Sequence, residues 1–174
     1  TNGNNMTVVG ISGASGTVEN GAATDAILTV NNTADYSFGG TLRNGATGKL
    51  TLIKEGAGVL TLAGSSSHSF TTVNAGTLAL NSATLNSFSS AVTVNDGGTL
   101  RLDASDQIVD TATVTVNTGG VLDMNGKGDT IKILAGSGNV TSTAAASTLI
   151  LKSGGSFAFS GVISGDGLSL QYYS

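Results

Sequence analysis

The chain has 174 residues with 26 glycines and no proline, cysteine or tryptophan, and only 10% of its residues are charged. The net charge of −4 and the seven scattered basic residues exclude the basic patch that nucleic-acid binding needs, and no apolar run reaches the roughly 18 residues of a membrane span. A hydrophobic fraction of 39% excludes a disordered linker, and with 5% aromatics the core must consist of Val, Leu, Ile and Ala.

The first half of the chain predicts short strands separated by glycine turns. After a polar segment, alternating apolar residues begin at 27–30 and return at 50–52. The stretch 50–81 holds two further alternating runs, Leu60-Thr61-Leu62 and Leu78-Ala79-Leu80, each preceded by a glycine turn. Apolar residues at period two with frequent glycine indicate strands and tight turns rather than helix.

The segment 72–80 is repeated twice further along the chain. Its sequence TVNAGTLAL returns as TVNDGGTLRL at 93–102 and as TVNTGGVLDM at 115–124. The first leucines of these repeats, Leu78, Leu100 and Leu122, are spaced by 22 residues. A period in the low twenties made of strand, turn and strand predicts a parallel β-solenoid in which each repeat forms one coil.

This spacing predicts a single all-β domain over residues 1–174. We expect about 20–22 residues per coil and about eight coils, stacked at the ~4.8 Å strand spacing of a sheet. Residues 1–20 are expected to form an N-terminal edge segment, 21–170 the coils and 171–174 a C-terminal edge.

Three finer expectations concern the register and the outer surface. Leu28 and Leu50 also lie 22 residues apart, so we expect them to align in neighbouring coils. The polar segment 103–110 is expected to leave the coil, as one short helical turn. Arg101 is expected to lie one coil from Asp123 and to form an outward pair of opposite charge with it.

Residues at equivalent positions of the repeats should stack in columns. Alternation turns the valines and leucines inward. The asparagine at the strand-to-turn corner tolerates the left-handed conformation, and its amide can bond to the same residue in the coils on either side. The expected stacking ladder consists of Asn74, Asn95, Asn117, Val73, Val94, Val116, Leu78, Leu100 and Leu122.

The sequence KEGAGVLTLAG at 54–64, followed by FTTVNAGTL at 70–78, resembles the autotransporter-associated β-strand repeat of bacterial secreted passengers. The pattern of that family is roughly K-x-G-x-G-x-L-x-L-x-G, a polar loop ending in an aromatic residue, then T-x-V-x-x-G-x-L. Here His68 and Phe70 replace the usual Asn-Tyr of the loop. The resemblance implies a right-handed, single-stranded parallel β-helix on or outside a bacterial cell. It implies no catalytic residues, because the repeat is a scaffold.

Few residues could carry chemistry. His68, the only histidine, lies in a serine-rich loop, and we interpret it as a solvated loop residue rather than a base or zinc ligand. Asp103, Asp106 and Asp110 could supply the carboxylate pair of a glycoside hydrolase. Aromatic platforms and basic subsites for a glycan are nearly missing, however. We therefore predict that the chain is not an enzyme and has no catalytic, cofactor-binding or metal site.

The sequence thus predicts a non-enzymatic extracellular or cell-surface structural protein. It would serve as a scaffold or adhesin, or as the subunit of a self-assembling fibre. The alternative is a module that binds a glycan or cleaves a polysaccharide, with ligand contacts on the loop 65–70 or on 103–110.

Both ends of the predicted stack are strand-like and lack a polar cap. Open strand edges of a solenoid pair readily with another strand. We expect the partner to be a second copy, head to tail, or adjacent repeats of a longer chain, and further partners to be a surface glycan or protein receptor. The expected end-to-end contact consists of Val8, Val9, Ile11, Leu168, Leu170 and Tyr172.

Overall fold

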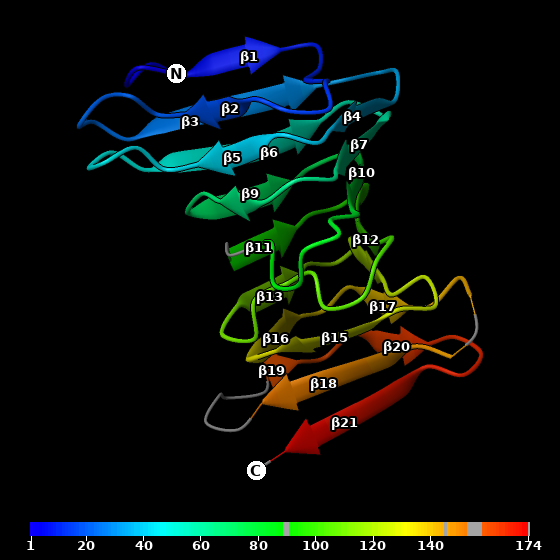
Figure 1. Cartoon of the computed structure of the whole chain (residues 1–174). Helices are drawn as coiled ribbons and strands as arrows, with labels where there is room; N and C mark the ends of the chain where they lie inside the picture. The colour runs from blue at the N-terminus through cyan, green and yellow to red at the C-terminus, as the bar shows by residue number, and fades with distance from the viewer. Residues whose placement is uncertain (89–90, 145, 153–157, 174) are drawn as a thin grey trace.

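A computed structural model describes residues 1–88, 91–144, 146–152 and 158–173 of the chain. Residue 174, the last of the expected C-terminal edge, lies outside this part. The described residues form short strands and no helix, and all pairs of neighbouring strands are parallel (Figure 1). The strands stack in chain order, so that the N-terminus and the C-terminus lie at opposite ends of the stack.

Each coil crosses three faces of the solenoid in the same order. The first face is an eight-stranded sheet of β1 (Met6–Val8), β3 (Ala26–Asn31), β6 (Leu50–Glu55), β9 (Phe70–Val73), β11 (Ala91–Val94), β13 (Thr113–Val116), β16 (Ile133–Gly136) and β19 (Ala158–Phe159). The second face is a seven-stranded sheet of β4 (Tyr36–Phe38), β7 (Val59–Leu62), β10 (Gly76–Leu80), β12 (Gly98–Leu102), β14 (Val121–Asp123), β17 (Asn139–Thr141) and β20 (Val162–Ser164).

The third face is interrupted in its middle. It begins with β2 (Thr17–Glu19), β5 (Thr41–Arg43) and β8 (Ser66–Ser67) and ends with β15 (Gly128–Ile131), β18 (Thr148–Lys152) and β21 (Ser169–Tyr173). Single bridges join Ser66 to Phe88 and Phe88 to Ile108 between these two sheets. The eight strands of the first face are separated by about seven turns, which confirms the predicted parallel β-solenoid.

The coils differ in length because their turns differ in length. Leu28 pairs with Leu52, 24 residues further on, so the predicted alignment of Leu28 with Leu50 is wrong. The extra residues lie in the turn 44–49, where Asn44 Oδ1 accepts the N–H of Leu50 at 2.8 Å. In the copies that revealed the period, by contrast, the pairing keeps the 22-residue spacing.

The core consists of inward columns on the three faces. Strand β6 alternates buried and half-exposed residues over its whole length, as do β11 and β13. The buried positions are filled almost throughout by Leu, Val and Ile. Burial of each such side chain stabilises the fold by about 1.5–3 kcal/mol. The core also contains the aromatic side chains of Phe38 and Phe88, which are 5% and 1% exposed, so the expectation of a core of Val, Leu, Ile and Ala alone is wrong.

The segment 103–110 belongs to the coil and has no helical turn, so this expectation is wrong. Gln107 and Ile108 are 0% and 1% exposed, and Ile108 forms the bridge to Phe88. Although the segment is rich in aspartate, its Gln-Ile pair supplies the third face of its coil.

Candidate functional site: ladders, buried polar side chains and open ends

The corner asparagines form a continuous hydrogen-bonded ladder. Asn95 Nδ2 donates to Asn74 Oδ1 at 2.8 Å, and Asn117 Nδ2 donates to Asn95 Oδ1 at 2.7 Å. Asn74 Nδ2 in turn donates to Glu55 Oε1 at 3.1 Å. All donors point the same way along the stack, and the ladder ends on a carboxylate. Sequence reasoning missed Glu55, although Lys54-Glu55 occupies the place of Val73-Asn74 in the preceding coil.

The predicted valine and leucine columns lie beside this ladder. Val94 pairs with Val73 on one side and Val116 on the other, and all three side chains are 0% exposed. The leucine column pairs in the same way, with exposed fractions of at most 1%, at Leu78, Leu100 and Leu122. The structure thus brings all nine residues of the expected ladder together across three adjacent coils.

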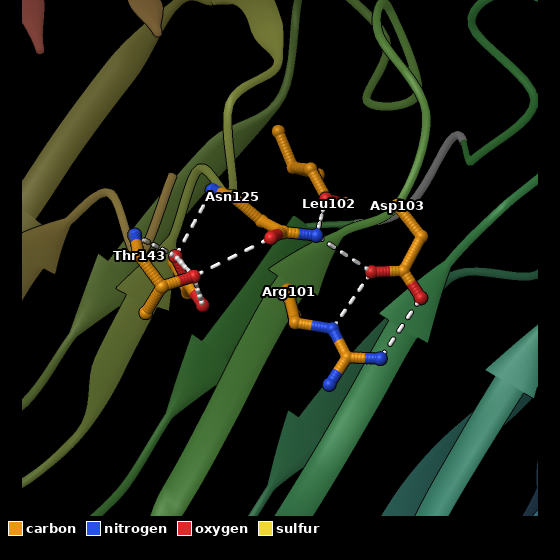
Figure 2. Close-up of polar contacts among 6 residues, drawn as sticks. Arg101, Leu102, Asp103, Asn125 and Thr143 are labelled. Atoms are coloured by element: carbon orange, nitrogen blue, oxygen red, sulfur yellow. Dashed lines mark hydrogen bonds and ion pairs between the residues drawn. The ribbon is translucent and has the colours of Figure 1, made fainter. Parts of the chain in front are cut away.

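The acidic corner after the second face is a closed polar network (Figure 2). Arg101 Nε donates to Asp103 Oδ1 at 2.7 Å and its Nη2 donates to Asp103 Oδ2 at 2.9 Å. The Arg101 guanidinium holds the pKa of Asp103 below its usual range. Arg101 and Asp123 are paired in register, but the ion pair joins Arg101 to Asp103 two residues along its own chain. The predicted outward pair with Asp123 is therefore wrong.

Asp123 is instead buried, at 5% exposed, and is bonded to the following coil. Its Oδ1 accepts the N–H of Asn125 at 2.9 Å, and its Oδ2 accepts the Thr143 hydroxyl at 2.9 Å. Asn125, which has a φ of 46°, also donates to Asp103 Oδ1 at 3.0 Å. Both carboxylates are used in fixing a turn, so the network is a structural tie between coils rather than an acid–base pair.

Asp106 and Asp110 are the other two carboxylates of the cluster that could have supplied a hydrolase pair. Asp110 forms an ion pair with Lys152 of β18, and Asp106 has the positive φ of a turn, 52°. Among the described residues, no group of three or more His, Cys, Asp or Glu side chains could hold a metal ion.

Lys54 is a core residue of the first face that sequence reasoning missed as such. It is 0% exposed and lies in the column between Val30 and Val73. Its Nζ donates to the carbonyl oxygens of Glu55 and Gly56, each at 2.8 Å, and to that of Ala75 in the next coil at 3.1 Å. Burial lowers the pKa of Lys54, and Asp35 and Glu55 partly offset that effect. The signal was its inward place in the alternation of Leu50 and Leu52.

His68 is buried, which overturns its interpretation as a solvated loop residue. The side chain is 1% exposed, and its Nε2 is hydrogen-bonded to Thr71 Oγ1 at 2.7 Å. The ring meets the ring of Phe88 edge to face, with centroids 5.4 Å apart. Its Nδ1 has no hydrogen-bond partner among the described residues. Burial lowers the pKa of His68 to about 4.

Asp129 is a second buried titratable group on the third face. It is 2% exposed, and its Oδ2 accepts the N–H groups of Gln107 and Ile108 at 2.9 and 3.1 Å. Burial raises the pKa of Asp129 to about 7, although its bonds from backbone N–H groups act in the opposite direction. These two hydrogen bonds connect β15 to the segment around Ile108 on the third face.

At both ends of the stack, core columns lack the next coil. At the C-terminal end, Leu170 pairs with buried Leu149 and is 41% exposed, and Tyr172 pairs with buried Leu151 and is 58% exposed. At the N-terminal end Val8 pairs with buried Val30.

The other expected end residues divide between core and surface. Val8, Ile11 and Leu168 are partly buried against the core, whereas Val9 is 75% exposed. The six expected residues thus form two separate surfaces, one at each end of the stack.

One shallow depression lies on the surface near β2 and β5. It has a volume of about 390 Å³, and Arg43 at its rim forms an ion pair with Glu19 at 2.6 Å. In the part of the chain that the structure describes, no helix is long and apolar enough to cross a membrane.

Comparison with known proteins finds a family match for one segment of the chain. Residues 52–80 match the model of the passenger-associated-transport-repeat. Neither a curated protein nor a solved structure matches the chain. The matched segment runs from β6 through the buried His68 to the end of β10, and includes Lys54, Asn74 and Leu78. The chain therefore carries, at residues 52–80 of a parallel β-solenoid, a passenger-associated-transport-repeat of the autotransporter passenger type.

Proposed function

We propose that this solenoid is a non-enzymatic structural element of an extracellular, passenger-type protein, and that it acts as a surface scaffold or adhesin shaft that extends by end-to-end stacking. The repeat match and the fold both indicate a secreted or cell-surface passenger. The side-chain ladders make the coils mutually dependent, which suits a rod that projects a surface away from a cell.

The uncovered core columns carry this proposal. Leu170 and Tyr172 continue columns whose residues are buried one coil earlier. Their side chains are exposed because no further coil covers them in this structure. A further parallel coil over β21 would bury both side chains and pair the free strand edge.

The order of the faces makes a second copy suitable as that coil. The described chain starts on the first face with β1 and finishes on the third with β21. A second copy stacked head to tail would therefore continue the sequence of faces without a break. Such a contact does not close on itself, so it would produce a filament.

Two tyrosines of one strand provide a matched test. Tyr172 points along the core column, whereas its neighbour Tyr173 pairs with exposed Lys152 and is equally open, at 57%. We expect the purified chain to associate with rising concentration in light scattering and to form filaments in electron microscopy. Tyr172→Lys should abolish this association and Tyr173→Lys should preserve it.

The opposite results would separate the two parts of the proposal. A chain that remains monomeric at all concentrations would overturn stacking between copies. The scaffold role would then rest on the solenoid alone, with adjacent repeats of a longer chain as the covering coil.

The glycan-binding alternative has one observation in its favour. Phe70, at the end of the loop after β8, is 51% exposed on the first face and could stack on a sugar ring. Binding on a glycan array that is lost in Phe70→Ala would support this function.

A further inference from the structure

His68 is the single ionisable side chain in a long stretch of the chain. Between Gly56 and Asn95 every other residue is uncharged, and this stretch spans about two coils. Because the imidazole is 1% exposed, a proton that binds to it places a charge in an otherwise neutral part of the core.

The ring occupies a corner position that other coils fill with asparagine. Glu19, Arg43 and Ser67 are paired across β2, β5 and β8, so the residues that follow them, Asn20, Asn44 and His68, share one corner. Asn20 Nδ2 donates to the carbonyl oxygens of Thr24 and Lys49 at 2.7 and 3.0 Å.

Asn44 is also hydrogen-bonded at this corner, since its Oδ1 accepts the N–H of Leu50 at 2.8 Å. In His68, by contrast, only Nε2 has a hydrogen-bond partner, the Thr71 hydroxyl. The buried Nδ1 has no partner among the described residues. Of the three corners at Asn20, Asn44 and His68, the corner of His68 is thus the one whose ring holds a buried nitrogen without a partner among the described residues.

The charged groups of the coil beneath do not offset a charge on the ring. Arg43 of β5 is ion-paired with Glu19, and Lys49 is exposed in the turn before β6. Lys54 and Glu55 lie at the far end of β6, where Lys54 is bonded to backbone carbonyls.

The elements around and above the ring supply no carboxylate either. His68 lies between β8 and β9, and neither the strands β8 to β11 nor the segment 81–88 contains an ionisable side chain. Asp110, on the coil beyond, is paired with Lys152, and the ring itself touches the uncharged side chains of Thr71 and Phe88.

We propose that this corner is an acid-sensitive breakpoint of the solenoid, at which protonation of His68 separates the third face between β8 and Phe88 while the coils on either side remain folded. The protonated ring turns Nδ1 into a second buried donor that lacks an acceptor among the described residues. The edge contact with Phe88 and the bridge from Ser66 to Phe88 are the contacts that opening would break.

The direction of the effect follows from the lowered pKa of His68. The ordinary value is 6.5 and the buried ring has about 4, so the closed corner prefers the neutral ring. Its stability is complete above pH 6.5 and falls as the pH drops from 6.5 towards 4. A difference of this size corresponds to a shift of about 300-fold in the equilibrium between closed and open corner.

The test needs no substitution for its first step. Because the chain has one histidine, its ring signals in nuclear magnetic resonance are assigned without ambiguity. We expect a titration midpoint near pH 4 in the folded chain. Amide hydrogen exchange of β8 and β9, corrected for intrinsic rates, should accelerate by up to about 300-fold over the same pH range while β13 and β16 stay protected.

Two variants distinguish the corner from a general effect of acid. His68→Asn restores the residue type of the other corners and should remove the local acceleration. Asp129→Asn removes the other strongly shifted group of the third face and should leave the acceleration unchanged. A midpoint near pH 6.5, or acid exchange in His68→Asn equal to that of the unmodified chain, would overturn the proposal.

Discussion

Lys54 shows how a single side chain can join two coils from within the core. Its stem lies in a column of valines, and its ammonium group reaches backbone carbonyls of its own turn and of the next coil. A buried cation is costly unless hydrogen bonds replace its hydration, and three carbonyls do so here. The lysine of the repeat pattern is thus a structural tie.

Substitution Lys54→Leu should lower the free energy of unfolding by about 2–3 kcal/mol, because three turn carbonyls lose a charged donor at once. Lys49→Leu is the matched control, since Lys49 is exposed in the turn before the same strand, and should change stability by less than about 0.5 kcal/mol. Urea denaturation followed by circular dichroism measures both. Equal effects of the two substitutions would contradict the role of Lys54.

Asp129 should make the fold less stable as the pH rises from acid to neutral. Its pKa is raised from 3.8 to about 7, so the folded chain binds this proton more tightly than the unfolded chain does. The stability from this group is complete below pH 3.8 and is lost as the pH rises to about 7, a difference on the order of 4 kcal/mol.

The variant Asp129→Asn cannot ionise at this position. Compared with the unmodified chain, it should therefore gain relative stability between about pH 5 and pH 8. Denaturant midpoints at these two pH values provide the measurement. A constant difference between the two proteins would show that Asp129 has an ordinary pKa.

At the scale of the strand and its corner, the asparagine ladder joins coils through side chains in addition to the backbone. Asn95 both donates and accepts a ladder bond, whereas Asn117 takes part in one ladder bond, as the donor to Asn95. The carboxylate of Glu55 at the start suits this direction, because it accepts from Asn74.

Substitution Asn95→Ala should therefore cost more than Asn117→Ala. The first removes two ladder bonds and the second removes one, at about 0.5–1.5 kcal/mol for each bond. Both residues are corner asparagines that precede a two-residue turn, so the backbone effects of the two changes are similar. Thermal unfolding of the two variants tests this order, and a smaller effect for Asn95→Ala would mean that the ladder adds no stability.

At the scale of the whole molecule, every coil is stabilised by the coils above and below it. The end strands β1 and β21 have a neighbour on one side only, whereas β9 and β11 have neighbours on both. In such a one-dimensional stack the stability of a coil depends on its contacts with its neighbours, so opening should start at the ends.

Hydrogen exchange at neutral pH should therefore be slowest in β9 and β11 and fastest in β1 and in β19 to β21. A uniform rate along the chain would show instead that the solenoid opens as one unit. Association of chains through Tyr172 should slow exchange in β21 most, which connects this experiment with the test of stacking.

The sequence alone determined the solenoid, its inward columns and the ladder from Asn74 to Asn117. Those features follow from local rules, because alternation fixes which side of a strand faces the core and equal spacing fixes which residues stack. The match at residues 52–80 agrees with the repeat recognised from the same residues.

Only the tertiary structure decided the register of the early coils and which polar side chains are buried. Turn length set the pairing of Leu28 with Leu52, and the neighbouring coils decided that His68 and Asp129 are buried. Alternation shows to which side of a strand a side chain points, but neither how deeply it is buried nor which group it contacts. Arg101 could therefore pair with Asp103 as readily as with Asp123. Burial of charge depends on residues about twenty positions away, and these meet only when the coils stack.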